Sequence, residues 1–192
     1  MFNSLFKIVY FSELIIITII RKLYTSNYKE SNLTINKKSK IDIFFLVLNG
    51  IGMIIPIIYV LSSVLDFANY NLPLWLGWTG SIIFIFAIWL LWKSHSDLGK
   101  LWSPTLGLQK NHNLIISGIY KYLRHPMYSA HLIWAIAQIM LLHNWIAGYS
   151  FLISQIPFYI YRIKIEEKMM IEKFGDEYKN YKKTTGSIIP KM

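Results

Sequence analysis

Long apolar runs alternate with short polar segments along the chain. Five of these runs approach or exceed the roughly 20 helical residues that cross a bilayer core about 30 Å thick. They cover residues 2–20, 43–65, 74–92, 127–143 and 145–161. Lys7 and Glu13 interrupt the first run, and only His143 and Asn144 separate the last two. The pattern predicts an all-α polytopic membrane protein with about five transmembrane helices, the last two forming a tight antiparallel hairpin.

The composition agrees with a membrane protein. Hydrophobic residues make up 54% of the 192 residues and charged residues 16%, with a mean hydropathy of +0.38. This is too apolar for an ordinary soluble domain. There is no cysteine, so disulfides and thiolate chemistry are excluded. The length indicates a single domain over residues 1–192.

The 20 basic residues give a formal net charge of +10, and their positions are uneven. With five spans, all of them except Lys7 fall on one side of the membrane. The positive-inside rule then predicts an N-terminus outside and a C-terminus in the cytoplasm. The basic surplus therefore reflects topology and attraction to anionic lipid, and no nucleic-acid partner is expected.

Two polar segments in the second half have a character of their own. Residues 95–117 are too polar to span and too rich in Trp and Leu for a free loop, so we expect a re-entrant or interfacial segment. Residues 162–183 alternate charged and apolar positions at helical spacing. The last span is therefore predicted to continue as a helix into the cytoplasm and to end near Gly175.

Arg162 and Glu166 stand four residues apart and so share one helix face just beyond the membrane. One interpretation is a surface ion pair worth a few tenths of a kcal/mol. The other is functional, because Glu166 and Glu167 are adjacent acids where the helix leaves the lipid. Taken alone, the pattern favours the surface pair.

His125 and Pro126 mark the start of the fourth span. Proline disfavours helical geometry at the residue before it and suits the first helical position, so His125 is predicted near the N-cap. A helix N-terminus attracts a carboxylate or phosphate, and Tyr128 lies in the first turn. An aromatic belt at the membrane boundary with a snorkelling Arg124 explains the same residues equally well.

Other kinds of site have weaker signals. The five histidines contain no H-x-x-x-H pair and there is no thiol, so no metal centre is expected. A G-x-S-x-G elbow and a G-x-G-x-x-G cradle are both absent from the sequence.

The segment "GIYKYLRHPMYSA" resembles the G-x-Y-x-x-x-R-H-P-x-Y signature of the isoprenylcysteine carboxyl methyltransferase family and its membrane methyltransferase relatives. The tail "RIKIEEKMMIEKFGDEYKNYKK" is similar to that family's R-x-x-x-E-E…F-G-x-x-Y-x-x-Y ending, and "LGKLWSP" to its upstream polar segment. The resemblance covers roughly residues 93–190. It implies N-terminal spans over residues 1–92 and a catalytic half over residues 93–192.

The resemblance implies a cytoplasm-facing pocket for S-adenosylmethionine and a lipophilic or prenylated substrate that enters from the bilayer. Arg162 matches the family's arginine that holds the substrate carboxylate. Arg162 and Glu167 are the two residues predicted to be catalytic. The residues implied to contact the cofactor are Gln109, His112, Asn113, Leu114, Ile115, Tyr120, His125, Pro126, Met127, Tyr128 and Glu166.

The predicted function is methyl transfer from S-adenosylmethionine to the carboxylate of a lipophilic substrate such as a C-terminal isoprenylcysteine. The alternative is a lipid amine N-methyltransferase, which needs a base such as Glu167 or His112. More distant alternatives are a sterol-reductase-like enzyme, against which Pro126 argues, and a non-catalytic membrane scaffold. A bacterial inner membrane is expected in preference to the endoplasmic reticulum.

Overall fold

The computed structural model describes residues 2–25, 33–36, 39–99, 107–109 and 113–191. Helices form most of this part of the chain, joined by short turns and one two-stranded ribbon. The helices are α1 (Phe2–Thr25), α2 (Lys40–Leu61), α3 (Leu74–Leu98), α4 (Pro126–Leu141), α5 (Trp145–Phe174) and α6 (Asp176–Thr184). Short 3-10 turns lie at η2 (Asp66–Ala68) and η4 (Gly118–Lys121), and strands β1 (Leu33–Asn36) and β2 (Gly107–Gln109) pair antiparallel.

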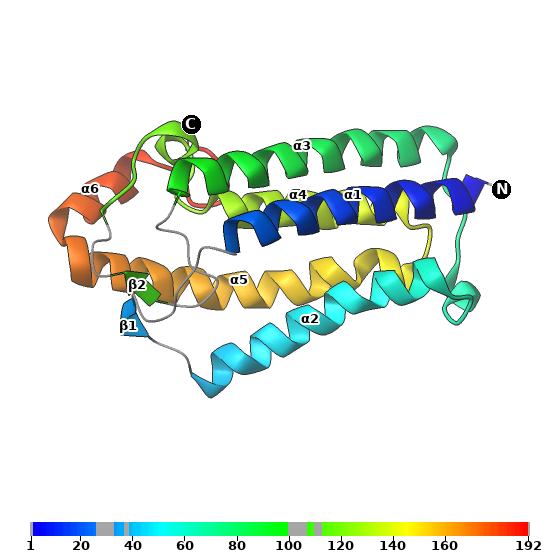
Figure 1. Ribbon diagram of the computed structural model, residues 1–192, viewed down its shortest axis with the longest axis horizontal. Coiled ribbons are helices and arrows are strands. Elements are labelled where there is room, and N and C mark those ends of the chain that lie inside the picture. Colours follow the sequence, from blue (N-terminus) through cyan, green and yellow to red (C-terminus); the bar gives the residue numbers. More distant parts are fainter. Residues whose placement is uncertain (1, 26–32, 37–38, 100–106, 110–112, 192) are drawn as a thin grey trace.

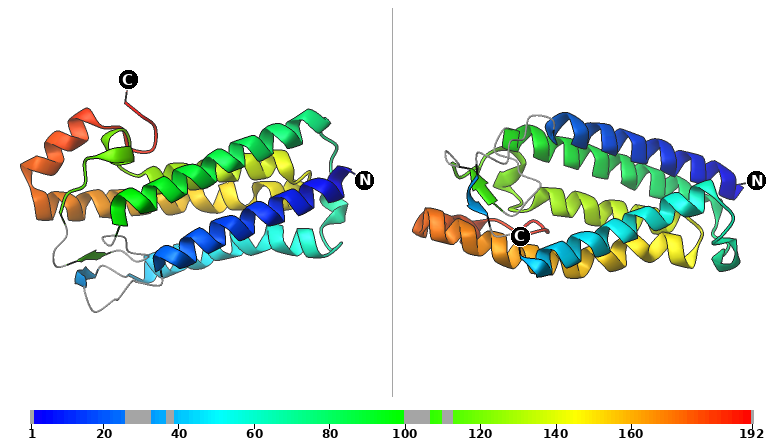
Figure 2. Two further views of the ribbon diagram at one scale, coloured as in Figure 1. Left: turned by 45° about the horizontal axis from the view of Figure 1, so that its top comes forward. Right: turned by 60° about the horizontal axis from the view of Figure 1, so that its bottom comes forward.

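The long helices α1 to α5 run along one axis and alternate in direction (Figure 1). The N-terminus lies at one end of this bundle. The start of α4, the end of α5, helix α6 and the β1–β2 ribbon lie at the other end, which we call the α6 end. The second half of α5 extends beyond its neighbours, and α6 folds back towards the bundle (Figure 2).

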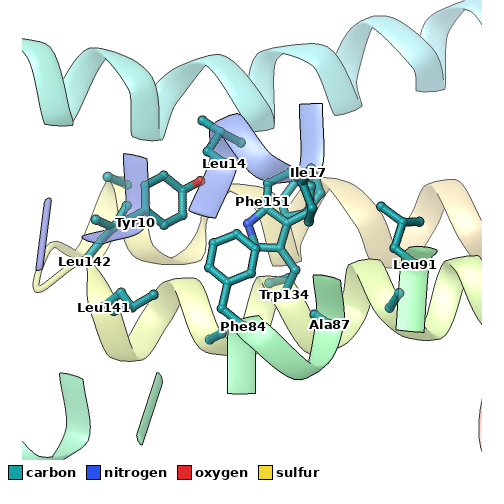
Figure 3. Packing of buried hydrophobic residues seen from close by; sticks show 14 of the residues in the cluster. Tyr10, Leu14, Ile17, Phe84, Ala87, Leu91, Trp134, Leu141, Leu142 and Phe151 are labelled. Atoms are coloured by element: carbon teal, nitrogen blue, oxygen red, sulfur yellow. The ribbon is translucent and has the colours of Figure 1, made fainter. Parts of the chain in front are cut away.

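The core forms where α1, α3, α4 and α5 meet. Phe84, Trp134 and Phe151 are fully or almost fully buried; Phe84 stacks on Trp134 with ring centroids 5.4 Å apart, and Trp134 lies tilted against Phe151 at 4.5 Å. Leu14 and Ile17 of α1 close the cluster (Figure 3). Burial of large side chains of this kind contributes about 1.5–3 kcal/mol each in water.

The two charges that interrupt the first apolar run both have partners. The buried Glu13 accepts a 2.6 Å hydrogen bond from Ser81 on α3. Lys7 lies 3.5 Å from the Asp66 carboxylate and 3.7 Å from the centre of the Tyr59 ring. An apolar helix tolerates such residues because neighbouring elements satisfy them.

Asn144 forms the tight turn between α4 and α5. Its side-chain oxygen accepts hydrogen bonds from the backbone N–H groups of Ile146 and Ala147, which caps α5. Its amide nitrogen donates to Leu65 O and to Asn69 Oδ1. The predicted hairpin is confirmed, and one residue joins it to the loop that follows α2.

Helix α2 packs chiefly against α5 and turns most of its apolar side chains outward. Its buried residues are Asp42, Gly52, Pro56 and Tyr59. The exposed ones include Ile43, Phe44, Val47, Ile51, Ile54, Ile58 and Leu61. An apolar surface of this extent is what lipid contact requires.

Each of the five predicted spans largely coincides with one of the long helices, but the spans over 43–65 and 127–143 run past the ends of α2 and α4. Within the described residues, α2 and α3 are long and apolar enough by themselves to cross a membrane. Helix α4 has 16 residues and is therefore only about 24 Å long. The all-helical character is confirmed, whereas the count of five spans stays a prediction.

Of the two expectations about the polar segments, one needs correction and the other is confirmed. The segment over residues 95–117 begins inside α3, which continues to Leu98, and Gly107–Gln109 forms a strand. That strand pairs with Leu33–Asn36, a pairing that four-residue and three-residue segments do not reveal on their own. The end of α5 at Gly175 is confirmed: this residue has φ +54° and caps the helix before α6 begins.

We predict that Gly52→Ala destabilises the protein by about 1–3 kcal/mol, as overpacking does. A Cβ at Gly52 would lie 2.7 Å from Ser154 Cβ and 2.9 Å from Ser150 O, so α2 would have to move away from α5. Thermal unfolding in detergent measures the effect. Gly50→Ala, in the same helix with nothing within 4 Å of the added carbon, is the matched control and should be at least as stable as wild type. Equal unfolding temperatures for the two variants would contradict the close α2–α5 contact.

Candidate active site

A glycine and an aspartate fix the chain that leads to α4. Gly118 has φ +60°, and a Cβ there would lie 2.6 Å from Asp97 Cγ. The Asp97 carboxylate accepts a 2.8 Å hydrogen bond from Ile119 N and another of 2.6 Å from Lys93. These bonds lower the pKa of Asp97 although its partial burial opposes this. Glycine is therefore required at position 118, and η4 is fastened to the end of α3.

His125 is the N-cap residue of α4 and Pro126 its first helical residue, as predicted. The chain after α6 runs alongside this segment. Arg124 N donates to Gly186 O at 2.8 Å, and His125 N donates to Ser187 O at 3.0 Å. The C-terminal segment therefore satisfies backbone N–H groups just ahead of α4.

Glu167 lies at the centre of a buried ionic cluster. Arg124 donates two hydrogen bonds to Glu167 Oε1, from Nε at 3.0 Å and from Nη2 at 2.7 Å. Lys182 of α6 lies 2.5 Å from Glu167 Oε2. Burial raises the pKa of Glu167, but His125, Lys182 and Arg124 lower it by more, so it lies well below the usual range. Glu167 is thus held as a carboxylate and joins the segment just ahead of α4 to α5 and α6.

Glu166 faces a different set of side chains. Its Oε1 accepts a hydrogen bond from the Tyr128 hydroxyl, and its Oε2 lies 3.4 Å from His125 Nδ1. The rings of His125 and Tyr128 stack at 5.5 Å, and Tyr128 stacks on Tyr159 at 4.1 Å. The side chain of Glu166 is 28% exposed, against 10% for Glu167. Of the two adjacent acids, Glu166 is therefore the one that a ligand can reach.

The environment of His125 favours its charged form. Burial lowers the pKa of this imidazole, but Glu166 and Glu167 raise it by more, so the pKa lies above its usual value. His125 Nε2 lies 3.6 Å from Glu167 Oε1, and His125 thus lies between the two carboxylates.

Arg162 is buried and pairs with Asp42 in the first turn of α2. Arg162 Nε donates to Asp42 Oδ1 at 3.2 Å, and Nη2 donates to Asp42 Oδ2 at 3.4 Å. Asp42 N in turn donates to Ser39 Oγ, which lies 2.8 Å from the Tyr161 hydroxyl. The surface ion pair considered for Arg162 is therefore wrong, because this guanidinium is 7% exposed.

The remaining predicted residues occupy several environments. Tyr120 is buried in η4, where its hydroxyl lies 3.4 Å from Ser94 O, and Met127 packs against the core. Asn113 is exposed, whereas Leu114 and Ile115 are half-buried ahead of η4. Gln109 ends β2, and His112 lies outside the described residues. The role of each in cofactor binding stays a prediction.

Sequence reasoning missed Asp42 and the partners of Glu167. Asp42 is an acid at the start of an apolar run, three residues after Ser39, and this S-x-x-D pattern signals a helix N-terminus. Nothing in that pattern indicates Arg162, which is 120 residues away. The chain offers no local signal for the Arg124–Glu167 pair either, because the two residues are 43 positions apart.

A comparison with protein families gives a match over this region. The model of the isoprenylcysteine carboxyl methyltransferase family matches residues 80–172, which include α4 and nearly all of α5. Over this region, which is just under half of the chain, the sequence is similar to the isoprenylcysteine carboxyl methyltransferase family. The family match and the apolar helices indicate an integral membrane protein.

Three curated relatives in this family carry the name protein-S-isoprenylcysteine O-methyltransferase. The Schizosaccharomyces pombe protein is 41% identical over 42% of this chain and 34% of its own length. The human protein is 31% identical over 68% of this chain and 49% of its own. Form B of Arabidopsis thaliana is 24% identical over 87% of both. The chain thus spans about half or less of the first two relatives.

A solved structure of the family shares the fold. It is that of the eukaryotic intramembrane Ras methyltransferase, with a TM-score of 0.56 and 24% sequence identity. The likeness covers 94% of this chain and 62% of that one. Because the family match ends at residue 172, it does not include the α6 residues that complete the Glu167 cluster.

We predict that Glu167→Gln destabilises the protein by about 3–5 kcal/mol, because it leaves the buried Arg124 without its counter-ion. Equilibrium unfolding in detergent measures the change. Asp176→Asn is the matched control, since it removes a carboxylate from an exposed pair with Lys179 and should leave stability near wild type. Similar stabilities for the two variants would contradict a structural role for the Glu167 cluster.

Proposed function

We propose that this protein is an integral membrane methyltransferase that transfers a methyl group from S-adenosylmethionine to the carboxylate of a lipophilic acceptor such as a C-terminal isoprenylcysteine. The observation that carries the proposal is the pairing of two groups on one helix. A reachable carboxylate, Glu166, and an arginine, Arg162, lie one turn apart where α5 leaves an apolar bundle. One suits a cationic cofactor and the other a carboxylate acceptor.

The residues around Glu166 fit the polar end of S-adenosylmethionine. Glu166 is the accessible carboxylate and can hold the ammonium of the methionine moiety, and His125 beside it, whose pKa is raised, can in its protonated form hold that moiety's carboxylate. The half-buried Leu114 and Ile115 can cover the adenine. When bound, S-adenosylmethionine supplies an electrophilic methyl group on its sulfonium.

Arg162 has the chemistry to orient the acceptor. A guanidinium holds both oxygens of a carboxylate in one plane, which a lysine does not. The acceptor carboxylate is already ionised near neutral pH, so the reaction needs no general base. Alignment of the attacking oxygen with the methyl carbon and the sulfur is therefore the main requirement, and such orientation can supply about 7–11 kcal/mol of a barrier.

One observation favours the amine acceptor of a lipid N-methyltransferase as a second candidate. Arg162 already has a carboxylate partner in Asp42, so it is not committed to an acceptor carboxylate. An amine must lose a proton, and the two candidate bases do not strengthen this alternative. The pKa of Glu167 is depressed by its ion pairs, which makes it a poor base, and His112 lies outside the described residues.

The test combines cofactor binding with methyl transfer by the full-length protein. We expect calorimetry to detect S-adenosylhomocysteine binding, and tritiated methyl groups to appear on a farnesylcysteine analogue and not on phospholipid. Arg162→Lys should bind S-adenosylhomocysteine like wild type. Its turnover should be about a hundredfold slower, because misplacing the acceptor carboxylate by about 1 Å can lower the rate by that factor. Glu166→Gln should weaken cofactor binding by about 1.5–3 kcal/mol.

Glu177→Gln makes the same change at an exposed position of α6 and is the control for Glu166→Gln. A wild-type protein that gives no binding heat with S-adenosylhomocysteine would contradict the enzyme and support the scaffold. Label on phospholipid, or full turnover by Arg162→Lys, would support the amine acceptor.

We further propose that the whole chain is one domain with five spans, its N-terminus outside and its α6 end in the cytoplasm. The alternation of α1 to α5 supports this arrangement (Figure 1). So does the distribution of charge, because within the described residues the basic side chains other than Lys7 belong to segments at the α6 end (Figure 1). A bacterial inner membrane stays the expected location, although the three relatives above are eukaryotic.

Reporter fusions test this topology. Fusions at residues 30 and 110 should read cytoplasmic, and a fusion at residue 70, in the turn between α2 and α3, should read external. A cytoplasmic signal at residue 70 would show that the spans or the orientation are wrong.

A further inference from the structure

Asp42 is a buried carboxylate that contacts the proposed acceptor arginine from another part of the chain. It is 1% exposed and receives two hydrogen bonds from Arg162, at 3.2 and 3.4 Å. It belongs to α2, outside the family match over residues 80–172. Ser39 fixes the backbone of Asp42 through a 3.1 Å hydrogen bond to its N–H, and α2 packs along α5.

The pairing of Asp42 with Nε and Nη2 of Arg162 has an electrostatic consequence. A carboxylate on Nε and Nη2 fixes the plane of the guanidinium and offsets its charge. An acceptor carboxylate that binds the same guanidinium comes close to a second negative charge. Water screens that charge poorly, because Asp42 is almost completely buried. A neutral methyl ester at the same place meets no such repulsion.

We propose that Asp42 is the counter-ion that positions Arg162 before an acceptor binds, and that it limits how strongly the site prefers a carboxylate acceptor to its neutral ester product. This inference rests on the proposed function. Asp42 is a positioning residue and takes no part in bond making. The negative charge of Asp42 lowers the affinity of the site for the carboxylate acceptor and leaves its affinity for the methyl ester product unchanged. The difference between these two affinities is therefore smaller than it would be without Asp42.

The test compares two ligands on the full-length protein with S-adenosylhomocysteine bound. N-acetyl-S-farnesylcysteine supplies the carboxylate, and its methyl ester is the neutral probe. Calorimetry gives the ratio of their affinities. In Asp42→Asn the acceptor carboxylate no longer meets the negative charge of Asp42 at Arg162, so this ratio should rise at least about tenfold, through tighter binding of the acid alone. Asp42→Glu keeps the charge, and its ratio should stay within about threefold of wild type.

Two further variants complete the experiment. Asp66→Asn removes a carboxylate beyond the far end of α2, where its partner is Lys7, and should leave the ratio unchanged. The double variant Asp42→Asn/Arg162→Gln buries no unpaired charge, and its ratio should fall below wild type. It provides the measurement if Asp42→Asn alone does not fold.

An unchanged ratio in Asp42→Asn, or a double variant that keeps the wild-type ratio, would overturn the inference and leave Asp42 as a tie between α2 and α5. A wild-type protein that binds both ligands but transfers no methyl group contradicts the proposed function alone, because the ratio is still measurable. A wild-type protein that binds neither ligand overturns the inference as well.

Discussion

A charge buried in an apolar bundle is costly unless a group of opposite charge lies against it, and this constraint shapes the α6 end of the molecule. Asp42 pairs with Arg162, and Glu167 pairs with Arg124 and Lys182. These pairs join elements that are distant in sequence: the first joins α2 to α5, and the second joins the segment just ahead of α4 to α5 and α6. The ion pairs thus connect α2 and α6 to the hairpin of α4 and α5 at this end of the molecule.

The same constraint separates the roles of two neighbouring acids. Glu166 and Glu167 are adjacent in the chain, but a helix turns their side chains to different sides. Glu167 points towards Arg124 and α6, and both of its oxygens are held in ion pairs. Glu166 points towards Tyr128 and His125 and stays partly exposed. A stable structure and an accessible carboxylate are therefore both obtained from one pair of residues. His125 lies between the two carboxylates, with one ring nitrogen near each.

The region that is similar to the family contains only part of this site. The match over residues 80–172 contains the reachable Glu166, the arginine at 162 and the start of α4. The parts that support them lie partly outside it: Asp42 on α2, Lys182 on α6, and the C-terminal segment whose carbonyls accept from Arg124 N and His125 N. The supporting contacts of this site therefore come from regions where the family match gives no information.

Much of this protein was determined by local properties of its sequence. Apolar runs long enough for helices predicted α1 to α5, Pro126 predicted the start of α4, and Gly175 predicted the end of α5. Each of these depends on contacts within a few residues, such as backbone hydrogen bonds and the conformational limits of proline and glycine. Only the tertiary structure decided that Arg162 meets Asp42 and that Glu167 meets Arg124 and Lys182. Ion pairs between distant residues leave no periodic pattern in the sequence, and each charged residue has many possible partners along the chain. The packing of α2 and α6 against α5 makes that choice.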